Sequence, residues 1–321
     1  MTRAPALPPP SRRAPQVALL ADGRRLHLQD GPIDLVIEAD GTMEAVRGAY
    51  AAAAGRLAGL LDGLCDELAL LRAPAVPDAC RLEGPVARRM WEAVRPFAAD
   101  HVITPMAAVA GAVAQEILAA MVRPGLTRAY VNNGGDIALH LSAGESFRVG
   151  LVDRPDLPHL TGTALIEAAS PVRGVATSGW RGRSFSLGIA DAVTILAPTA
   201  AMADAAATIV ANDVDLPGHR DILRVPADSL QPDSDLGARL VTRAVPLLSA
   251  AERARALDTG LACAHDLVRR GLIHAAALHL QGETAGTGAG LSATFPAARH
   301  AALHHVPQHG QPQHQQGRTH A

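Results

Sequence analysis

One short segment of the chain combines a carboxylate and a hydroxyl at a spacing that suits a metal site. Asp204 and Thr208 lie four residues apart in an Ala-rich run, so a helix would place both side chains on one face. Their oxygens are hard ligands of the kind that Mg²⁺ prefers, and Mg²⁺ leaves coordination positions free for phosphate. A helix with one exposed Asp is the alternative interpretation, and for this pair taken alone it is the favoured one.

A second segment, residues 131–136, reads Val-Asn-Asn-Gly-Gly-Asp and lies between two expected strands. Gly134 and Gly135 could form a hairpin turn. They could also let a ligand lie against bare backbone, while Asn133 and Asp136 supply polar atoms to it. From the residues alone, the turn is the favoured interpretation.

A third segment, Thr177, Ser178 and Gly179, follows the end of an expected strand. Two hydroxyls and a glycine suit contact with a phosphate or a ribose through side-chain and backbone groups. An ordinary turn has the same composition. No residue of the chain is assigned a catalytic role at this point.

The composition excludes several classes of chemistry. All 29 basic residues are arginine, and because arginine cannot act as an amine nucleophile, Schiff-base and pyridoxal-phosphate chemistry are excluded. The P-loop lysine is excluded as well. A net charge of −2 and an aromatic content of 2% argue against nucleic acid as a partner.

The chain also lacks the usual signals for export or membrane insertion. Its Pro- and Arg-rich beginning has no apolar core of the kind found in signal peptides, and no stretch is long and apolar enough to span a bilayer. The three cysteines have no metal or disulfide spacing. These features predict a soluble, cytoplasmic protein with no membrane partner.

The elements that must position the three segments alternate between helix-like and strand-like patterns. Long Ala- and Leu-rich stretches predict helices early in the chain, and short β-rich runs separated by Gly, Pro, Asp or Ser predict strands after residue 128. Strands are expected at 17–42 (two), 129–133, 137–141, 147–152, 162–168, 172–177, 191–197 and 273–283, and helices at 43–71, 85–98, 105–122, 199–212, 236–249 and 250–270. This order favours an α+β fold, an antiparallel sheet with helices packed on one face.

The same patterns predict one folded domain with two disordered ends. Residues 1–16 form a Pro- and Arg-rich arm, residues 17–283 the domain, and residues 284–321 a Gly-rich and then His- and Gln-rich tail. The histidines of the tail could chelate adventitious metal, although a solvated tail is favoured. The helices at 43–71 and 105–122 could form a homodimer interface or simply pack inside the core.

Taken together, the motifs NNGGDI, TSG and DAVTILAPTAAMADAAAT resemble those of the ApbE-like superfamily, and in particular a shorter, uncharacterised branch of it. The named members of that superfamily are Mg²⁺-dependent FAD:protein FMN transferases. The resemblance implies a T-fold-like architecture, Mg²⁺ bound by Asp204 and Thr208, and a flavin pocket. The pocket would be lined by Asn133, Gly134, Gly135, Asp136, Thr177, Ser178 and Gly179.

Two parts of the superfamily pattern differ in this chain. Gly111, in the helix segment PMAAVAGAVAQEIL, stands where the family has a lysine. The family's His-Ile-Ile-Asp-Pro segment is absent, and residues 182–190 make a short connection in its place. The reaction could therefore differ from FMN transfer.

Three hypotheses follow for the function. The first is a protein that binds a nucleotide-type small molecule, FAD with Mg²⁺, and transfers FMN if it is catalytic. The second is a cofactor-biosynthesis enzyme acting on a pterin- or purine-like ligand, with Asp136 beside the ring; this hypothesis depends on fold analogy. The third is a ligand-binding protein without catalysis, which would not depend on Mg²⁺.

Overall fold

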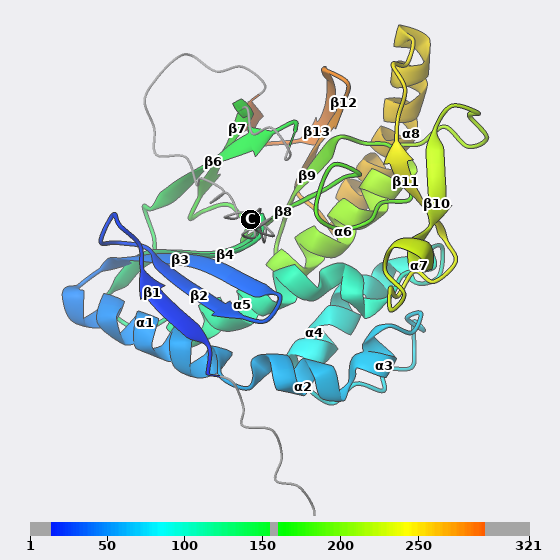
Figure 1. The fold of residues 1–321 in the computed structure, drawn as a ribbon. Coiled ribbons are helices and arrows are strands. Elements are labelled where there is room, and N and C mark those ends of the chain that lie inside the picture. Colours follow the sequence, from blue (N-terminus) through cyan, green and yellow to red (C-terminus); the bar gives the residue numbers. More distant parts are fainter. Residues whose placement is uncertain (1–13, 155–159, 293–321) are drawn as a thin grey trace, which may run out of the picture.

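The computed structural model describes residues 14–154 and 160–292, and a nine-stranded sheet lies at its centre (Figure 1). The strand order is β1-β2-β3-β4-β5-β8-β9-β12-β13, and every neighbouring pair is antiparallel. The bounds are β1 Gln16–Leu19, β2 Leu26–Asp30, β3 Ile33–Gly41, β4 Leu126–Asn133, β5 Asp136–Leu141, β8 Gly174–Ser178, β9 Ala192–Ala197, β12 Ala275–Leu280 and β13 Glu283–Gly288. The predicted antiparallel sheet is confirmed.

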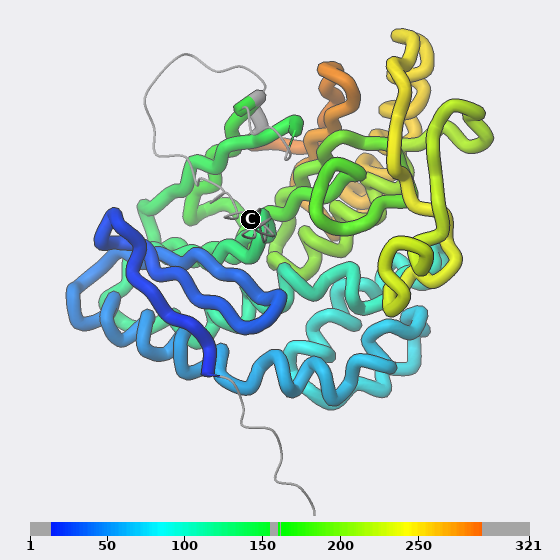
Figure 2. Tube along the Cα trace, viewed as in Figure 1, coloured from blue at the N-terminus to red at the C-terminus, as the bar shows by residue number. Residues whose placement is uncertain are grey.

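Helices cover one face of this sheet, as the α+β prediction requires. Helix α1 (Met43–Leu57) packs on β3, α5 (Val109–Met121) on β4 and β5, α6 (Ala200–Asp213) on β8 and β9, and α8 (Ala250–Arg269) on β12 and β13. The strands supply alternate apolar residues to this core, such as Leu35, Ile37 and Ala39 of β3, because successive side chains of a strand point to opposite faces. Figure 2 follows the chain from β1 at one edge of the sheet to β13 at the other.

A second, smaller sheet covers part of the opposite face, which the sequence did not predict. Its order is β14-β7-β6, with β6 Ser146–Val152, β7 Leu160–Glu167 and β14 Leu291–Ser292. Val149 and Ile166 of this sheet share a buried cluster with Ile137, Leu139 and Val175 of the large sheet. The large sheet therefore has an apolar core on each side, with helices on one side and strands on the other.

The helix predicted at residues 43–71 is wrong in its extent. The structure has three helices there: α1, α2 (Leu60–Asp66) and α3 (Leu68–Leu71). Gly59 adopts a left-handed backbone conformation, φ 76°, which glycine enters without steric cost and which ends a helix. The helices at 85–98 and 105–122 are α4 (Pro85–Val94) and α5, joined to short 3₁₀ turns at Arg95–Phe97 and Pro105–Ala108.

The helix predicted at residues 236–249 is wrong in kind. Residues Leu240–Ala244 form strand β11, which pairs with β10 (Leu223–Pro226), and the short helix α7 (Ala227–Leu230) follows β10. Gly237 has a left-handed φ of 54°, and the backbone N–H of Thr242 donates to the carbonyl of Ser186. These pairings are tertiary contacts that override the local helical pattern.

The tail predicted to be disordered from residue 284 also needs correction. Residues Glu283–Gly288 form β13, paired with β12, and Leu291–Ser292 form β14, paired with β7. Gly288 is needed there because a Cβ would clash with the backbone of His274 and Ala275. The arm predicted at 1–16 ends in β1, which begins at Gln16. Residues 1–13 and 293–321, with the histidines of the tail, lie outside the described residues.

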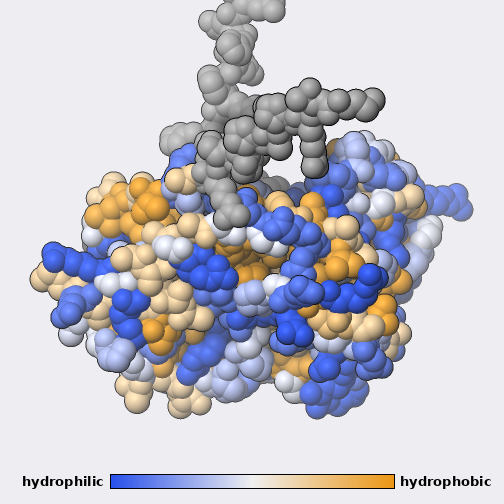
Figure 3. Space-filling model, turned by 90° about the horizontal axis from the view of Figure 1, so that it is seen from below, coloured by the Kyte–Doolittle hydropathy of each residue, from blue (hydrophilic) through white to orange (hydrophobic). Residues whose placement is uncertain are grey.

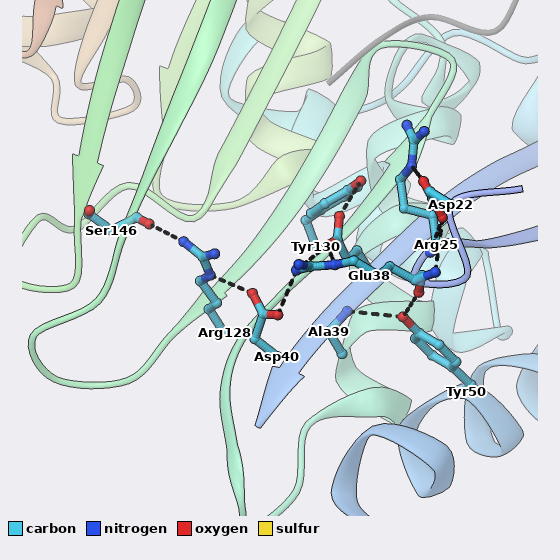
Figure 4. Close-up of polar contacts among 10 residues, drawn as sticks. Asp22, Arg25, Glu38, Ala39, Asp40, Tyr50, Arg128, Tyr130 and Ser146 are labelled. Carbon is cyan, nitrogen blue, oxygen red and sulfur yellow. Dashed lines mark hydrogen bonds and ion pairs between the residues drawn. The ribbon is translucent and has the colours of Figure 1, made fainter. Parts of the chain in front are cut away.

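A network of charged and aromatic side chains lies beside the hairpin turn that joins β1 and β2 (Figure 4). Arg24 forms ion pairs with Glu38, at 2.8 Å, and with Asp40, at 3.0 Å, and Arg128 pairs with Asp40 at 2.7 Å. The hydroxyl of buried Tyr130 donates to Glu38 at 3.2 Å. These contacts tie the β1–β2 turn, β3 and β4 together on the face away from the helices.

The remaining surface gives few functional signals. On the face shown in Figure 3, apolar and polar side chains are interspersed. All three cysteines are free thiols. Within the described part of the chain, no helix is long and apolar enough to span a membrane.

Candidate functional site

The hairpin between β4 and β5 carries the first group of candidate residues. Asn133 pairs directly with Asp136, so Gly134 and Gly135 form a two-residue loop, with φ of 66° and 117°. The Asn132 side chain closes the turn by accepting the N–H of Gly135 at 2.8 Å. The turn predicted from the sequence is confirmed, and glycine is needed at both positions because both have positive φ.

Asp136 lies at the first position of β5, where it faces the end of β8. Its carboxylate accepts the backbone N–H of Thr177, and the guanidinium of Arg183 lies near it; both interactions favour the charged form. Desolvation by the surrounding protein is the larger effect and raises the pKa of Asp136 to about 7. A carboxylate in this state readily accepts a cation or a proton.

Asp204, on the second turn of α6, reaches the N-terminus of α5. Its Oδ2 atom accepts the backbone N–H of Gly111 at 2.9 Å, and the N–H of Ala110 also donates to its carboxylate. Free N–H groups at a helix N-terminus favour a negative charge. Desolvation and the nearby charge of Asp136 outweigh that effect and raise the pKa of Asp204 well above its usual range. The structure thus brings Asp136 and Asp204 together.

Other predicted residues surround this pair of carboxylates. Thr208 lies one helical turn after Asp204 on α6 and keeps partial exposure. The Asn133 side chain donates to the carbonyl of Ala110 at 3.1 Å. That bond fixes the β4–β5 hairpin against the N-terminus of α5, which is the reason the two carboxylates approach each other.

The Thr177–Gly179 segment contributes mainly through its backbone. The Thr177 side chain points to the opposite face of the sheet and hydrogen-bonds to Thr194 at 2.9 Å, so only its N–H meets Asp136. Strand alternation places Ser178 on the helix-covered face together with Ala176. Gly179, with φ 153°, passes so close to the Asp191 carbonyl that a Cβ would lie 2.6 Å from it.

The sequence analysis did not identify two residues near the site as functional candidates. Arg183, an exposed residue in the short connection at 182–190, lies against Gly134, and a Cβ at Gly134 would collide with its guanidinium. Gly111 supplies a backbone N–H to Asp204, and a Cβ there would collide with the carbonyl of Ala200. The only sequence signal for Gly111 was its place in the motif, and Arg183 had none.

The assembled groups form a compact set of hard oxygens beside one guanidinium. Two carboxylates and a hydroxyl suit a divalent cation such as Mg²⁺, and a guanidinium suits phosphate. The two carboxylates repel each other in a desolvated setting, so a cation between them would relieve the repulsion. Among the described residues, no group of three or more His, Cys, Asp or Glu is arranged to hold a metal by itself. Further ligands would come from hydroxyls, backbone, water or a phosphate.

Comparison with known proteins places the chain in a family. The family model described as "AbpE bacteria" matches residues 17–286. The chain therefore belongs to this family, and the predicted ApbE-like superfamily is confirmed.

Individual relatives are more distant. A UPF0280 protein of Methanopyrus kandleri is 43% identical over 127 residues, which are 40% of this chain and 48% of the relative. A UPF0280 protein of Methanosarcina acetivorans is 38% identical over 141 residues, 43% of this chain and 53% of the relative. The matched segment of this chain thus spans about half the length of these relatives.

Among solved structures, the apo form of the flavinyl transferase ApbE of Pseudomonas stutzeri is similar, with a TM-score of 0.43 and 12% sequence identity. The match covers 85% of this chain and 94% of that chain. A similarity at this level says nothing about what the present chain binds.

Proposed function

We propose that this protein binds a flavin nucleotide together with Mg²⁺, and that Asp204 and Thr208 hold the metal beside Asp136. The observation that carries the proposal is the approach of the Asp136 and Asp204 carboxylates, each with a pKa raised by desolvation. Capping of α5 would by itself explain why a carboxylate is present at position 204, since Asp204 accepts two backbone N–H groups. Capping does not explain why a second carboxylate, that of Asp136, is held beside it.

The residues present fit the proposed ligands. Mg²⁺ would neutralise the two carboxylates and leave positions for phosphate oxygens. Arg183, next to Asp136, would bind a phosphate, a role for which the chain has no lysine. The bare backbone at Gly134 and Gly135 would let the nucleotide approach closely. When bound, Mg²⁺ supplies charge stabilisation at a phosphate, which is the requirement for transfer of FMN with release of AMP.

Titration calorimetry with FAD, in the presence and absence of Mg²⁺, tests this proposal. Asp204→Asn keeps an acceptor oxygen for the N–H of Gly111 but removes the charge, so the α5 cap survives while the metal site weakens. We expect the wild type to bind FAD only with Mg²⁺ and Asp204→Asn to lose at least about tenfold in affinity, as for the loss of a charged interaction. Asp258→Asn, at an exposed position of α8, is the matched control and should bind as the wild type does.

Other outcomes identify the alternatives. FAD binding that does not depend on Mg²⁺ and survives Asp204→Asn would favour a binding protein without metal chemistry. No FAD binding, together with binding of a pterin that is lost in Asp136→Ala, would favour a cofactor-biosynthesis enzyme. Release of AMP from FAD, measured by chromatography, would show that the bound nucleotide is turned over.

A further inference from the structure

The connection between β8 and β9, residues 179–190, carries Arg183 to the site. Residues 182–184 are the tip of this connection and are exposed. The guanidinium of Arg183 lies against the Gly134–Gly135 turn, where a Cβ on Gly134 would overlap it. An exposed arginine side chain loses conformational freedom when it binds a ligand. The readiness of Arg183 for binding therefore depends on how firmly the rest of the connection is held.

One end of the connection is fastened by Asp191, a carboxylate directly before β9 that is 4% exposed. Its Oδ1 atom accepts the Nε–H of Arg181 at 2.6 Å and the indole N–H of Trp180 at 3.2 Å. Its Oδ2 atom accepts the backbone N–H of Gln281, in the β12–β13 turn, at 2.5 Å. The Cζ atom of Arg181 lies over the Trp180 ring, 4.3 Å from its centroid. Asp191 thus holds the two residues before Gly182 in one arrangement.

The other end of the connection is fastened by Asn212, near the C-terminus of α6. Its Oδ1 atom accepts the backbone N–H of Leu187 at 2.9 Å and the hydroxyl of buried Ser186 at 3.2 Å. Gly188 lies so close to α6 that a Cβ there would collide with the carbonyl of Ala211. This end is therefore packed tightly on the helix.

Asn212 also relates the connection to the proposed metal ligands. Helix α6 carries Asp204, Thr208 and Asn212 at intervals of four residues, which places the three side chains along one face of the helix. One helix thus holds both the candidate metal ligands and one end of the segment that carries Arg183.

Stability alone is a poor explanation for the anchor at Asp191. A buried ion pair often contributes no net stability relative to apolar side chains of the same size, because the cost of desolvation offsets the attraction. Arg181 and Asp191 form such a pair, with side chains that are 22% and 5% exposed. What this pair does fix is the backbone two residues before Arg183.

We propose that Asp191 and Asn212 are positioning residues that hold Arg183 against the Gly134–Gly135 turn, ready to bind a diphosphate. This inference rests on the proposed function and adds to it the groups that preorganise the phosphate contact. In this role neither residue contacts the ligand. Because the connection is ordered before binding, less conformational entropy is lost when a phosphate meets the guanidinium.

Pyrophosphate with Mg²⁺ is the probe, because it has the charge that Arg183 would bind and no flavin ring. Calorimetry measures its affinity for the wild type, for Arg183→Ala and for the two anchor variants, Asp191→Asn and Asn212→Ala. We expect each anchor variant to lose about three- to tenfold, the scale of ordering one flexible side chain on binding, and Arg183→Ala to lose at least as much. In the Arg183→Ala background the anchor variants should have no further effect, because the group that they position is gone.

Limited proteolysis with trypsin tests the anchors without any ligand. Trypsin cleaves after arginine, and cleavage of a folded protein requires local opening of the chain. The bond between Arg183 and Ser184 should therefore be cut slowly in the wild type and faster in both anchor variants. Cleavage after Arg220, in an exposed turn, is the internal reference and should not change. Pyrophosphate should slow the cut after Arg183 in the wild type.

A conservative variant and a matched control separate positioning from a loss of stability. Asn212→Asp keeps the acceptor and should recover most of the affinity that Asn212→Ala loses. Glu116→Gln, in α5, removes the charge of another partly buried carboxylate, one that pairs with Arg56 at 2.8 Å and with Arg89 at 2.6 Å. It should lower the melting temperature without weakening pyrophosphate binding or speeding cleavage after Arg183.

The inference is overturned if the wild type does not bind pyrophosphate, if either anchor variant binds it as tightly as the wild type, or if the anchor variants lose the same factor in the Arg183→Ala background. FAD binding that depends on Mg²⁺ and on Asp204, combined with full pyrophosphate affinity in both anchor variants, would overturn this inference alone. Pyrophosphate binding that depends on Arg183 and on both anchors, combined with no FAD binding, would overturn the flavin proposal alone.

Discussion

Asp136 on β5 and Asp204 on α6 are far apart in the chain, yet the charge of Asp136 adds to desolvation in raising the pKa of Asp204. They meet because the β4–β5 hairpin and the N-terminus of α5 are fastened together: Asn133 donates to the carbonyl of Ala110, and Gly111 donates to Asp204. Two carboxylates held together with little water repel each other. A shared proton or a divalent cation relieves the repulsion, and the following predictions develop this relationship.

The stability of the metal-free protein should fall as the pH rises from about 5 to 8. Desolvation raises the folded pKa of Asp136 to about 7, above its ordinary value of 3.8, so the folded state holds a proton that the unfolded state has lost. This contribution is complete below the unfolded pKa and disappears as the pH passes through the folded pKa. Calorimetric melting temperatures at pH 5 and pH 8 should differ by a few degrees.

Added Mg²⁺ should reverse that trend, because the metal takes the place of the proton at the carboxylates. Mg²⁺ binding therefore becomes stronger as the pH rises. Asp204→Asn should melt at a higher temperature than the wild type at pH 8 without metal, and should gain no stability from Mg²⁺. A wild type whose melting temperature at pH 8 equals that of Asp204→Asn, with and without Mg²⁺, would contradict the assignment.

Gly111→Ala should destabilise the fold and disturb the site. A Cβ at this position would collide with the carbonyl of Ala200, so α5 and α6 would have to separate, at a cost of about 1–3 kcal/mol. Gly55→Ala in α1 is the matched control, because nothing lies within 4 Å of its Cβ position. It should stabilise the protein by about 0.5–1 kcal/mol. Urea unfolding measures both, and equal effects would argue against close packing at Gly111.

Arg183→Ala should weaken FAD binding about tenfold or more, because it removes the cation beside Asp136 that we assign to a phosphate. The salt dependence of FAD binding should also decrease in this variant, since the charge of Arg183 contributes part of that dependence. Calorimetry at two ionic strengths measures both effects. Arg243→Ala, at an exposed position of β11, should change neither. Unchanged affinity and salt dependence in Arg183→Ala would exclude the phosphate role.

Glu38 offers a test of the network in Figure 4. Glu38→Ala leaves the hydroxyl of buried Tyr130 without its acceptor and should cost about 1–3 kcal/mol. Glu38→Gln keeps an acceptor and loses only the ion pair with the exposed Arg24, which should cost less than about 1 kcal/mol. Chemical unfolding of both variants measures the difference, and equal losses would show that the ion pair matters more than the hydroxyl.

Much of the architecture follows from local sequence patterns. The strands around Val131, Ile137 and Val193 and the helix containing Asp204 are where the hydrophobic patterns predict them. The Gly134–Gly135 turn is also set locally, because two positive φ angles require glycine. Predictions failed at Gly59, whose left-handed backbone divides a helix, and at Leu240–Ala244 and Glu283–Gly288, which are strands only because distant strands pair with them.

For the site, the sequence by itself determined which side chains are available, namely those of Asp136, Asp204 and Thr208. It also determined that arginine, in the absence of lysine, supplies the permanent positive charges. Only the tertiary structure decided that Asp136 meets Asp204 and that Arg183 lies against Gly134. The physical reason is that burial and electrostatic coupling depend on contacts between segments distant in the chain. No local pattern of residues encodes those contacts.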